Sequence, residues 1–151
     1  MRQQNHGNII TIGSLAGLIA VPFQSYYSAA KHALEGFFKS LRFEVRPFNI
    51  NISVIEPGFF KTNLHEAFDY AKPYISDYDK IRDRALQVFS GSIEKAPVPD
   101  SIARLVMKIL NSGRPKYSYP IGKNTWLAPF LQYMAYRIFE FGIRKKFGLP
   151  A

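Results

Sequence analysis

The sequence contains no cysteine, only three histidines and roughly half as many acidic as basic residues. Without cysteine it can form no disulfide framework, no thiolate metal site and no cysteine nucleophile. His6, His32 and His65 do not have the sequence spacing of a zinc site, so we expect no bound metal.

Long hydrophobic runs are also missing. The longest nearly uncharged stretch near the C-terminus, residues 125–136, contains Pro129 and is shorter than the roughly 20 residues that a membrane-spanning helix needs. The polar N-terminus leads directly into a strand-like run and lacks the pattern of a signal peptide. These features predict a cytoplasmic protein.

The 151 residues are 47% hydrophobic, which is enough for one packed domain. The net charge of +9 is unevenly distributed. Residues 1–113 contain 13 basic and 10 acidic residues, whereas residues 114–151 contain 7 basic and 1 acidic residue. The basic character therefore belongs mainly to the C-terminal segment.

The first half of the chain alternates between strand and helix patterns. The β-branched run 9–12 predicts a strand buried on both faces, which ends at Gly13. Apolar residues then recur every three or four positions over 23–45 and predict a helix that Pro47 stops. A second short strand is expected over 51–56, before Pro57 and Gly58.

The second half continues this alternation. We expect a weak helix over 74–90, a helix over 102–110, a third strand over 116–121 and one long amphipathic helix over about 126–147. The order predicts an α/β fold, a partial Rossmann-like doubly wound parallel sheet of about three strands with a C-terminal amphipathic helix. We expect two parts, a sheet domain over 1–122 and the amphipathic helix over 123–151.

Three side chains could carry chemistry: Ser14, Tyr27 and Lys31. Tyr27 and Lys31 lie four residues apart on one helix face, and Lys31 interrupts an apolar stripe. An ammonium beside a phenol stabilises the phenolate and lowers its pKa from about 10, which favours acid–base catalysis. Ser14 follows the first strand at the sheet edge where open α/β sheets bind ligands. Alternatively, the tyrosine belongs to the core and the serine to a turn.

Three sequence blocks, over residues 7–17, 27–37 and 52–62, together resemble the second half of a compact short-chain dehydrogenase/reductase. The resemblance covers about residues 2–122. It implies NAD(P)-dependent interconversion of a carbonyl and an alcohol, with NAD or NADP as cofactor. It also implies that Tyr27 is the general acid–base, that Lys31 lowers its pKa and holds the nicotinamide ribose, and that Ser14 orients the substrate carbonyl.

The same resemblance implies that Pro57 and Gly58 shape the loop against the nicotinamide and that Thr62 binds its carboxamide or a phosphate. Tyr26 is out of register with Lys31 and receives no role. The family's glycine-rich turn, its Asn-Asn-Ala-Gly stretch and its catalytic asparagine are absent. We therefore expect a truncated form that lacks the N-terminal cofactor-binding half and binds the dinucleotide poorly.

Aromatic residues recur over 59–97, where the family keeps its substrate-binding region; they are Phe59, Phe60, Phe68, Tyr70, Tyr74, Tyr78 and Phe89. They favour a bulky apolar substrate, although they could equally cover the sheet edge.

The aromatic and basic C-terminal helix suits the surface of an anionic membrane, but it could also pack on its own subunit or on a second copy. We do not expect nucleic acid as a partner, because no recognition motif accompanies the basic residues. The resemblance also implies a homo-oligomer. The alternative to an enzyme is a non-catalytic remnant that acts through dimerisation or membrane-surface association.

Overall fold

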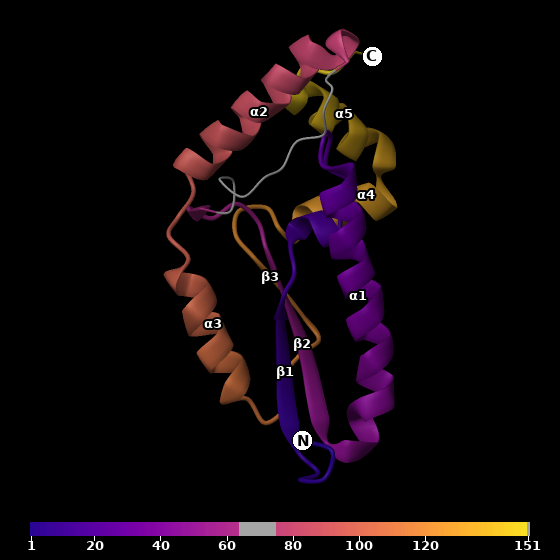
Figure 1. Cartoon of the computed structure of the whole chain (residues 1–151), viewed down its shortest axis with the longest axis vertical. Coiled ribbons are helices and arrows are strands. Elements are labelled where there is room, and N and C mark those ends of the chain that lie inside the picture. The colour runs from indigo at the N-terminus through magenta and orange to yellow at the C-terminus, as the bar shows by residue number, and fades with distance from the viewer. Residues whose placement is uncertain (64–74, 151) are drawn as a thin grey trace.

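A computed structural model describes residues 1–63 and 75–150. Three strands, β1 (Gly7–Ile12), β2 (Ile50–Pro57) and β3 (Ser118–Ile121), form a parallel sheet in the order β1-β2-β3 (Figure 1). The apolar run of β2 lies at the centre, where Ile52, Val54 and Ile55 are at most 1% exposed. The predicted α/β class, the parallel direction and the three strands are confirmed.

The prediction that the first strand is buried on both faces is wrong. No residue of β1 is buried, and Ile12 is 47% exposed. The reason is the strand order, because β1 pairs with β2 alone among the described residues, whereas β2 pairs on both sides. A β-branched run indicates a strand but does not say whether that strand is central.

Helices lie on both sides of the sheet. Figure 1 shows α1 (Ser25–Val45) on one side and α3 (Asp100–Leu110) on the other, with α2 (Asp79–Glu94) beyond the end of the sheet. Helix α1 ends just before Pro47, as the sequence predicts. Pro47 continues the chain as η2 (Arg46–Phe48), a short 3₁₀ turn that Asn49 closes in the left-handed conformation.

The predicted single C-terminal helix is instead two helices, α4 (Leu127–Met134) and α5 (Tyr136–Phe147). Ala135 separates them with φ −140° and ψ 55°, outside the helical region. The break lets each helix meet a different partner. Gln132 of α4 bonds the backbone of Leu18 and Ala20, whereas Phe147 of α5 packs on Ala85 and Phe89 of α2.

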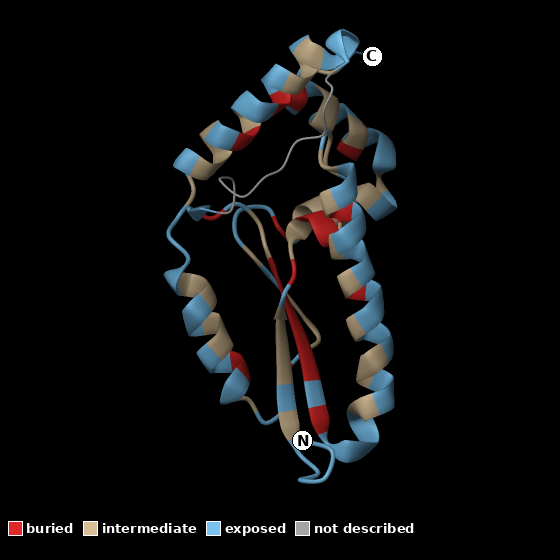
Figure 2. Cartoon of the chain, in the orientation of Figure 1, coloured by how far each residue is buried: buried red, intermediate tan, exposed pale blue. Residues whose placement is uncertain are grey.

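The apolar stripe that predicts this helix consists of Leu127, Leu131, Met134, Ile138 and Phe141, and it does not form a buried face. Met134, Ile138 and Phe141 are 72%, 63% and 68% exposed, and the buried rings of α5 are Phe139 and Phe147. Figure 2 shows exposed residues along much of α5. The stripe assumed one continuous helix, but the interruption at Ala135 changes which residues face inward.

Candidate active site

The carboxyl ends of the three strands meet at one edge of the sheet, because the strands are parallel. Hydrogen bonds hold the loops at this edge together. The Gly13 N–H donates to the Ile55 carbonyl at 2.8 Å, and the Gly58 N–H donates to the Ile121 carbonyl at 2.9 Å. These bonds fix the chain immediately before Ser14 and immediately after Pro57.

Ser14 begins η1 (Leu15–Gly17), a 3₁₀ turn that follows β1. Its backbone is extended, and its Oγ accepts a hydrogen bond from the Ala16 N–H at 3.1 Å. A serine hydroxyl is both an acceptor and a donor, so this bond leaves the O–H hydrogen available for another acceptor. Ser14 is therefore anchored without losing the function that the resemblance assigns to it.

Tyr27 and Lys31 lie together on α1, against the end of β1. The Lys31 ammonium nitrogen is 5.6 Å from the centroid of the Tyr27 ring and donates to the Ile12 carbonyl at 3.4 Å. Both residues are half-buried, and burial lowers the pKa of the Lys31 ammonium. The predicted tyrosine–lysine pair therefore meets the strand that leads into Ser14.

Close packing at Gly17 seats the Ser14 loop on the same turn of α1. A Cβ atom on Gly17 would lie 2.8 Å from the Lys31 carbonyl oxygen and 3.3 Å from Glu35 Cγ. Only a residue without a side chain allows the loop and the helix to approach this closely. The backbone thus joins the Ser14 loop to the turn that carries Lys31.

Pro57 and Gly58 follow β2 at the same edge. A Cβ atom on Gly58 would lie 3.0 Å from Thr125 Cγ2, a tight contact, so glycine gives the loop after β3 room to approach this loop. Thr125 is 2% exposed and donates its hydroxyl to the Gly122 carbonyl at 3.1 Å. Thr62 is exposed and follows Lys61, whose N–H donates to the Pro97 carbonyl at 2.9 Å.

A buried polar network beneath this edge was missed by the sequence reasoning. Glu35 lies one helical turn after Lys31 and is 5% exposed, and Glu56 ends the buried part of β2 and is fully buried. Tyr117 links distant segments, because its hydroxyl lies 2.9 Å from the Glu35 carbonyl and 3.2 Å from Glu35 Oε2. The sequence contains one signal of their burial, because both glutamates interrupt apolar patterns.

Burial dominates the electrostatics of these carboxyl groups. It raises the pKa of Glu56 to about 7, against the opposing hydrogen bonds from Ser118 and the Tyr119 backbone, and the nearby Glu35 raises it further. It also raises the pKa of Glu35, against the Tyr117 hydrogen bond and the charges of Lys39 and His32. Glu35 Oε1 is buried and makes no hydrogen bond within residues 1–63 and 75–150.

The aromatic residues of segment 59–97 divide between the core and the surface. Phe60 and Phe89 are each 7% exposed, and Phe89 packs edge-on against Phe147 with ring centroids 5.4 Å apart. Phe59 and Tyr78 are 38% and 53% exposed. Phe68, Tyr70 and Tyr74 lie outside the described residues. Core packing therefore accounts for part of the aromatic pattern.

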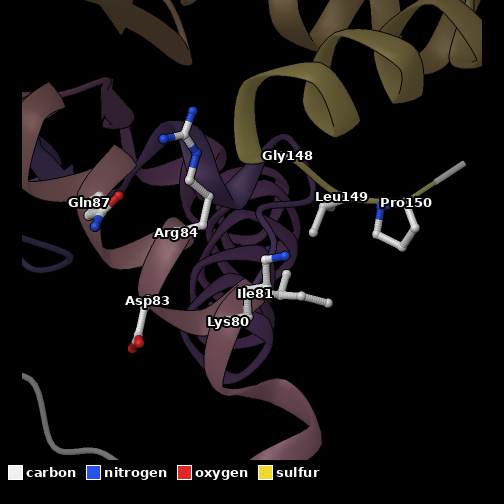
Figure 3. A pocket seen from close by; sticks show the side chains of 8 residues that line it. All are labelled: Lys80, Ile81, Asp83, Arg84, Gln87, Gly148, Leu149 and Pro150. Atoms are coloured by element: carbon white, nitrogen blue, oxygen red, sulfur yellow. The ribbon is translucent and has the colours of Figure 1, made fainter.

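A separate shallow depression lies between α2 and the chain after α5 (Figure 3). Lys80, Asp83 and Arg84 of α2 contribute to its wall opposite residues 148–150. It contains none of the predicted site residues.

Among the described residues, no helix is both long enough and apolar enough to cross a membrane.

Comparison with known proteins gives a consistent result. The family model described as short chain dehydrogenase matches residues 1–72. A probable short-chain type dehydrogenase/reductase, VdlC of Helicobacter pylori, is 33% identical and aligns over 84% of this chain and 47% of its own length. A 3-ketodihydrosphingosine reductase of Bacteroides thetaiotaomicron is 28% identical over 92% of this chain and 56% of its own length.

Solved structures share the fold. A short-chain dehydrogenase from Streptomyces avermitilis superposes with a TM-score of 0.71 at 24% identity, over 98% of this chain and 54% of that one. A short-chain dehydrogenase/reductase from Burkholderia phymatum in complex with NAD superposes with a TM-score of 0.73 at 19% identity, over 91% of this chain and 51% of that one. The chain thus spans about half the length of the relatives it matches.

Proposed function

Since this chain belongs to the short-chain dehydrogenase/reductase family, we propose that it supplies the proton-transfer residues of an NAD(P)-dependent oxidoreductase that interconverts a carbonyl and an alcohol. One observation carries the proposal. The Lys31 ammonium is held beside the Tyr27 ring, at 5.6 Å from its centroid, by the end of the strand that leads into Ser14. A cation in that position favours transfer of the phenolic proton.

In the proposed mechanism, Ser14 donates its hydroxyl hydrogen to the substrate oxygen and holds it near Tyr27. In reduction, Tyr27 gives its proton to that oxygen, and in oxidation it removes the alcohol proton. Lys31 stabilises the negative charge that develops on the phenol oxygen. A bound nicotinamide cofactor supplies or accepts the hydride that completes the reaction.

The donors present fit a nicotinamide ribose. A lysine ammonium has three N–H donors, and among the described residues only the Ile12 carbonyl takes one from Lys31. The other two are available for ribose hydroxyls. Pro57, Gly58 and Thr62, which follow β2 at the same sheet edge, are proposed to line the nicotinamide side of the site.

The test compares Tyr27→Phe with Tyr26→Phe, a matched control on the adjacent, 90% exposed tyrosine. Both variants are made in this chain and in a chimera that joins it to the N-terminal half of VdlC. Carbonyl reduction is followed by loss of NADH or NADPH absorbance. We expect Tyr27→Phe to lower turnover by about 10²–10⁴-fold and Tyr26→Phe to leave it unchanged.

Equal activity of the two variants would contradict the assigned role of Tyr27. Circular dichroism of both variants verifies that the fold is retained, because each substitution removes only a hydroxyl. Running the assay with each cofactor also tests whether the chain uses NAD or NADP. The solved relatives include both cases, since one was solved with NAD and another, from Burkholderia cenocepacia, with NADP.

For the substrate we propose a bulky apolar carbonyl compound. The exposed rings of Phe59 and Tyr78 support this choice, as does similarity to a protein named 3-ketodihydrosphingosine reductase. A long-chain ketone should therefore be reduced with a higher kcat/KM than a short hydroxyketone. The opposite order would overturn the choice. The cytoplasmic location stays a prediction.

We also propose that copies of the chain associate through α1. Ala30, Ala33 and Phe37 are all exposed on one line of this helix, since seven residues make about two turns. Sedimentation velocity of the parent and of Phe37→Glu tests the contact. We expect the parent to be a dimer and the variant a monomer, and a monomeric parent would refute the proposal.

A further inference from the structure

The C-terminal helices α4 and α5 leave more large apolar side chains exposed than buried. On α4, Tyr133 and Met134 are 66% and 72% exposed, and on α5 Ile138 and Phe141 are 63% and 68% exposed. Single exposed apolar side chains are ordinary, but several of them within one short segment are typical of an interaction surface. Their inward counterparts, Phe139 and Phe147, already fill the contacts that α5 makes with its own chain.

Basic residues flank this apolar surface on α5. Arg137, Ile138, Phe141 and Lys145 are all exposed and fall within about 100° of the helix circumference, opposite the side that carries Phe139 and Phe147. Together with Tyr133 and Met134 they form what we term the aromatic–basic surface. Its apolar centre and cationic flanks have the composition of helices that lie in a membrane interface.

The charge on this surface is not neutralised within the described part of the chain. Residues 123–150 contain five basic residues and one acidic residue, Glu140, which pairs with Arg144 at 2.8 Å. The Lys146 ammonium instead lies over the Phe59 ring, 5.1 Å from its centroid. Arg137 and Lys145 form no ion pair with any described carboxylate and remain exposed.

This charge distribution argues against a second copy as the occupant. Two copies that met through the aromatic–basic surface would bring Arg137 and Lys145 of each against those of the other, with no outward carboxylate to compensate. The face of an anionic lipid bilayer complements both the cations and the apolar side chains, because its phosphates pair with the cations and the edge of its acyl region accepts the rings.

We propose that the aromatic–basic surface of α4 and α5 binds the face of an anionic lipid bilayer, with Ile138 and Phe141 entering the headgroup region and Arg137 and Lys145 pairing with lipid phosphates. This contact is peripheral. It is also independent of the redox chemistry proposed above, since it involves none of Ser14, Tyr27 and Lys31.

The first experiment measures co-sedimentation of the protein with vesicles of phosphatidylglycerol and phosphatidylcholine, against vesicles of phosphatidylcholine alone. We expect binding to the anionic vesicles that weakens as salt is raised, and little binding to the neutral ones. Glycerol phosphate in solution should not compete. Displacement by that soluble anion would show a phosphate site rather than a lipid surface and would overturn the proposal.

Matched variants locate the contact. Arg137→Gln with Lys145→Gln should weaken vesicle binding about thirtyfold, because each cation near an anionic surface contributes about a fivefold effect. Arg104→Gln with Lys108→Gln removes the same charge from exposed positions of α3 and should have little effect. Phe141→Ser should weaken binding about tenfold or more, whereas Phe43→Ser, at a 77% exposed ring of α1, should not.

The single tryptophan gives a direct optical readout. Trp126 precedes α4 and is 71% exposed, with Phe130 one turn along. Its emission should shift to shorter wavelength with anionic vesicles and stay unchanged with neutral ones. Absence of vesicle binding, or equal losses in the α3 and α5 charge variants, would refute the proposal. So would a self-association that Phe141→Ser abolishes without any vesicle binding, which would instead identify a second copy.

Discussion

The buried Glu56 carboxyl should make the stability of the folded chain depend on pH. Its pKa is about 7 in the folded chain, mainly because burial disfavours its charge, against an ordinary value of 4.5. Between these two values the folded chain holds a proton that the unfolded chain has released. Stability must therefore fall as pH rises through this range, and the full loss is present above about pH 7.

The magnitude follows from the same two values. Each tenfold change in proton affinity corresponds to ~1.4 kcal/mol, so the interval from 4.5 to about 7 corresponds to about 3.5 kcal/mol at most. Glu56→Gln removes the ionisation and keeps an oxygen that can accept the Tyr119 N–H, now bonded at 2.8 Å. We expect the free energy of unfolding of the variant to exceed that of the parent by about 2–3 kcal/mol at about pH 8. At about pH 5 the difference should be less than about 1 kcal/mol.

The assay is urea unfolding of parent and variant, followed by circular dichroism across this pH range. The difference between the two proteins cancels the other titrating groups that they share. Glu44→Gln, at an exposed glutamate of α1, is the control and should leave the pH dependence unchanged. Parallel losses of stability in Glu56→Gln and in the parent as pH rises would show that Glu56 does not cause the pH dependence.

Two further substitutions probe the same region with the same unfolding assay. Tyr117→Phe removes the donor to Glu35 and should cost about 1–3 kcal/mol, whereas Tyr133→Phe at an exposed site should cost almost nothing; equal costs would show that the hydrogen bond is unimportant. Gly13→Ala places a Cβ 2.9 Å from Val54 Cγ1 and 3.3 Å from Glu35 Oε1, so a loss of about 1–3 kcal/mol is expected. Gly36→Ala, whose Cβ meets nothing within 4 Å on α1, should instead gain about 0.5–1 kcal/mol, and a gain at both positions would contradict the packing argument.

Much of the fold follows from local pattern. Gly13 and the Pro57-Gly58 pair end the first two strands close to where the sequence places their ends, and α1 ends at Val45, the expected position before Pro47. These residues act through their own backbone restrictions, so their effect does not depend on distant parts of the chain. The pairing of Tyr27 with Lys31 is equally local, since four residues separate them on one helix.

The wrong expectations share a different cause. Whether β1 is central or at an edge depends on strand order, and whether Ile138 or Phe139 faces inward depends on where α5 meets α2. Neither depends on the residue's immediate neighbours. An apolar period reports which residues share a face, but the partner that covers the face lies elsewhere in the sequence.

The polar network beneath the site shows why the site itself could be only partly predicted. Lys31 and Glu35 lie on successive turns of α1. Gly17 packs against the backbone of Lys31 and the side chain of Glu35, so this short segment of α1 determines the position of the Ser14 loop. The burial of Glu35 nevertheless requires a donor, and that donor is Tyr117, 82 residues further along the chain. The proposed reactive groups are therefore specified locally. The electrostatic environment beneath them is completed by a long-range contact, because burying a carboxyl is costly without a hydrogen bond and here Tyr117 supplies one.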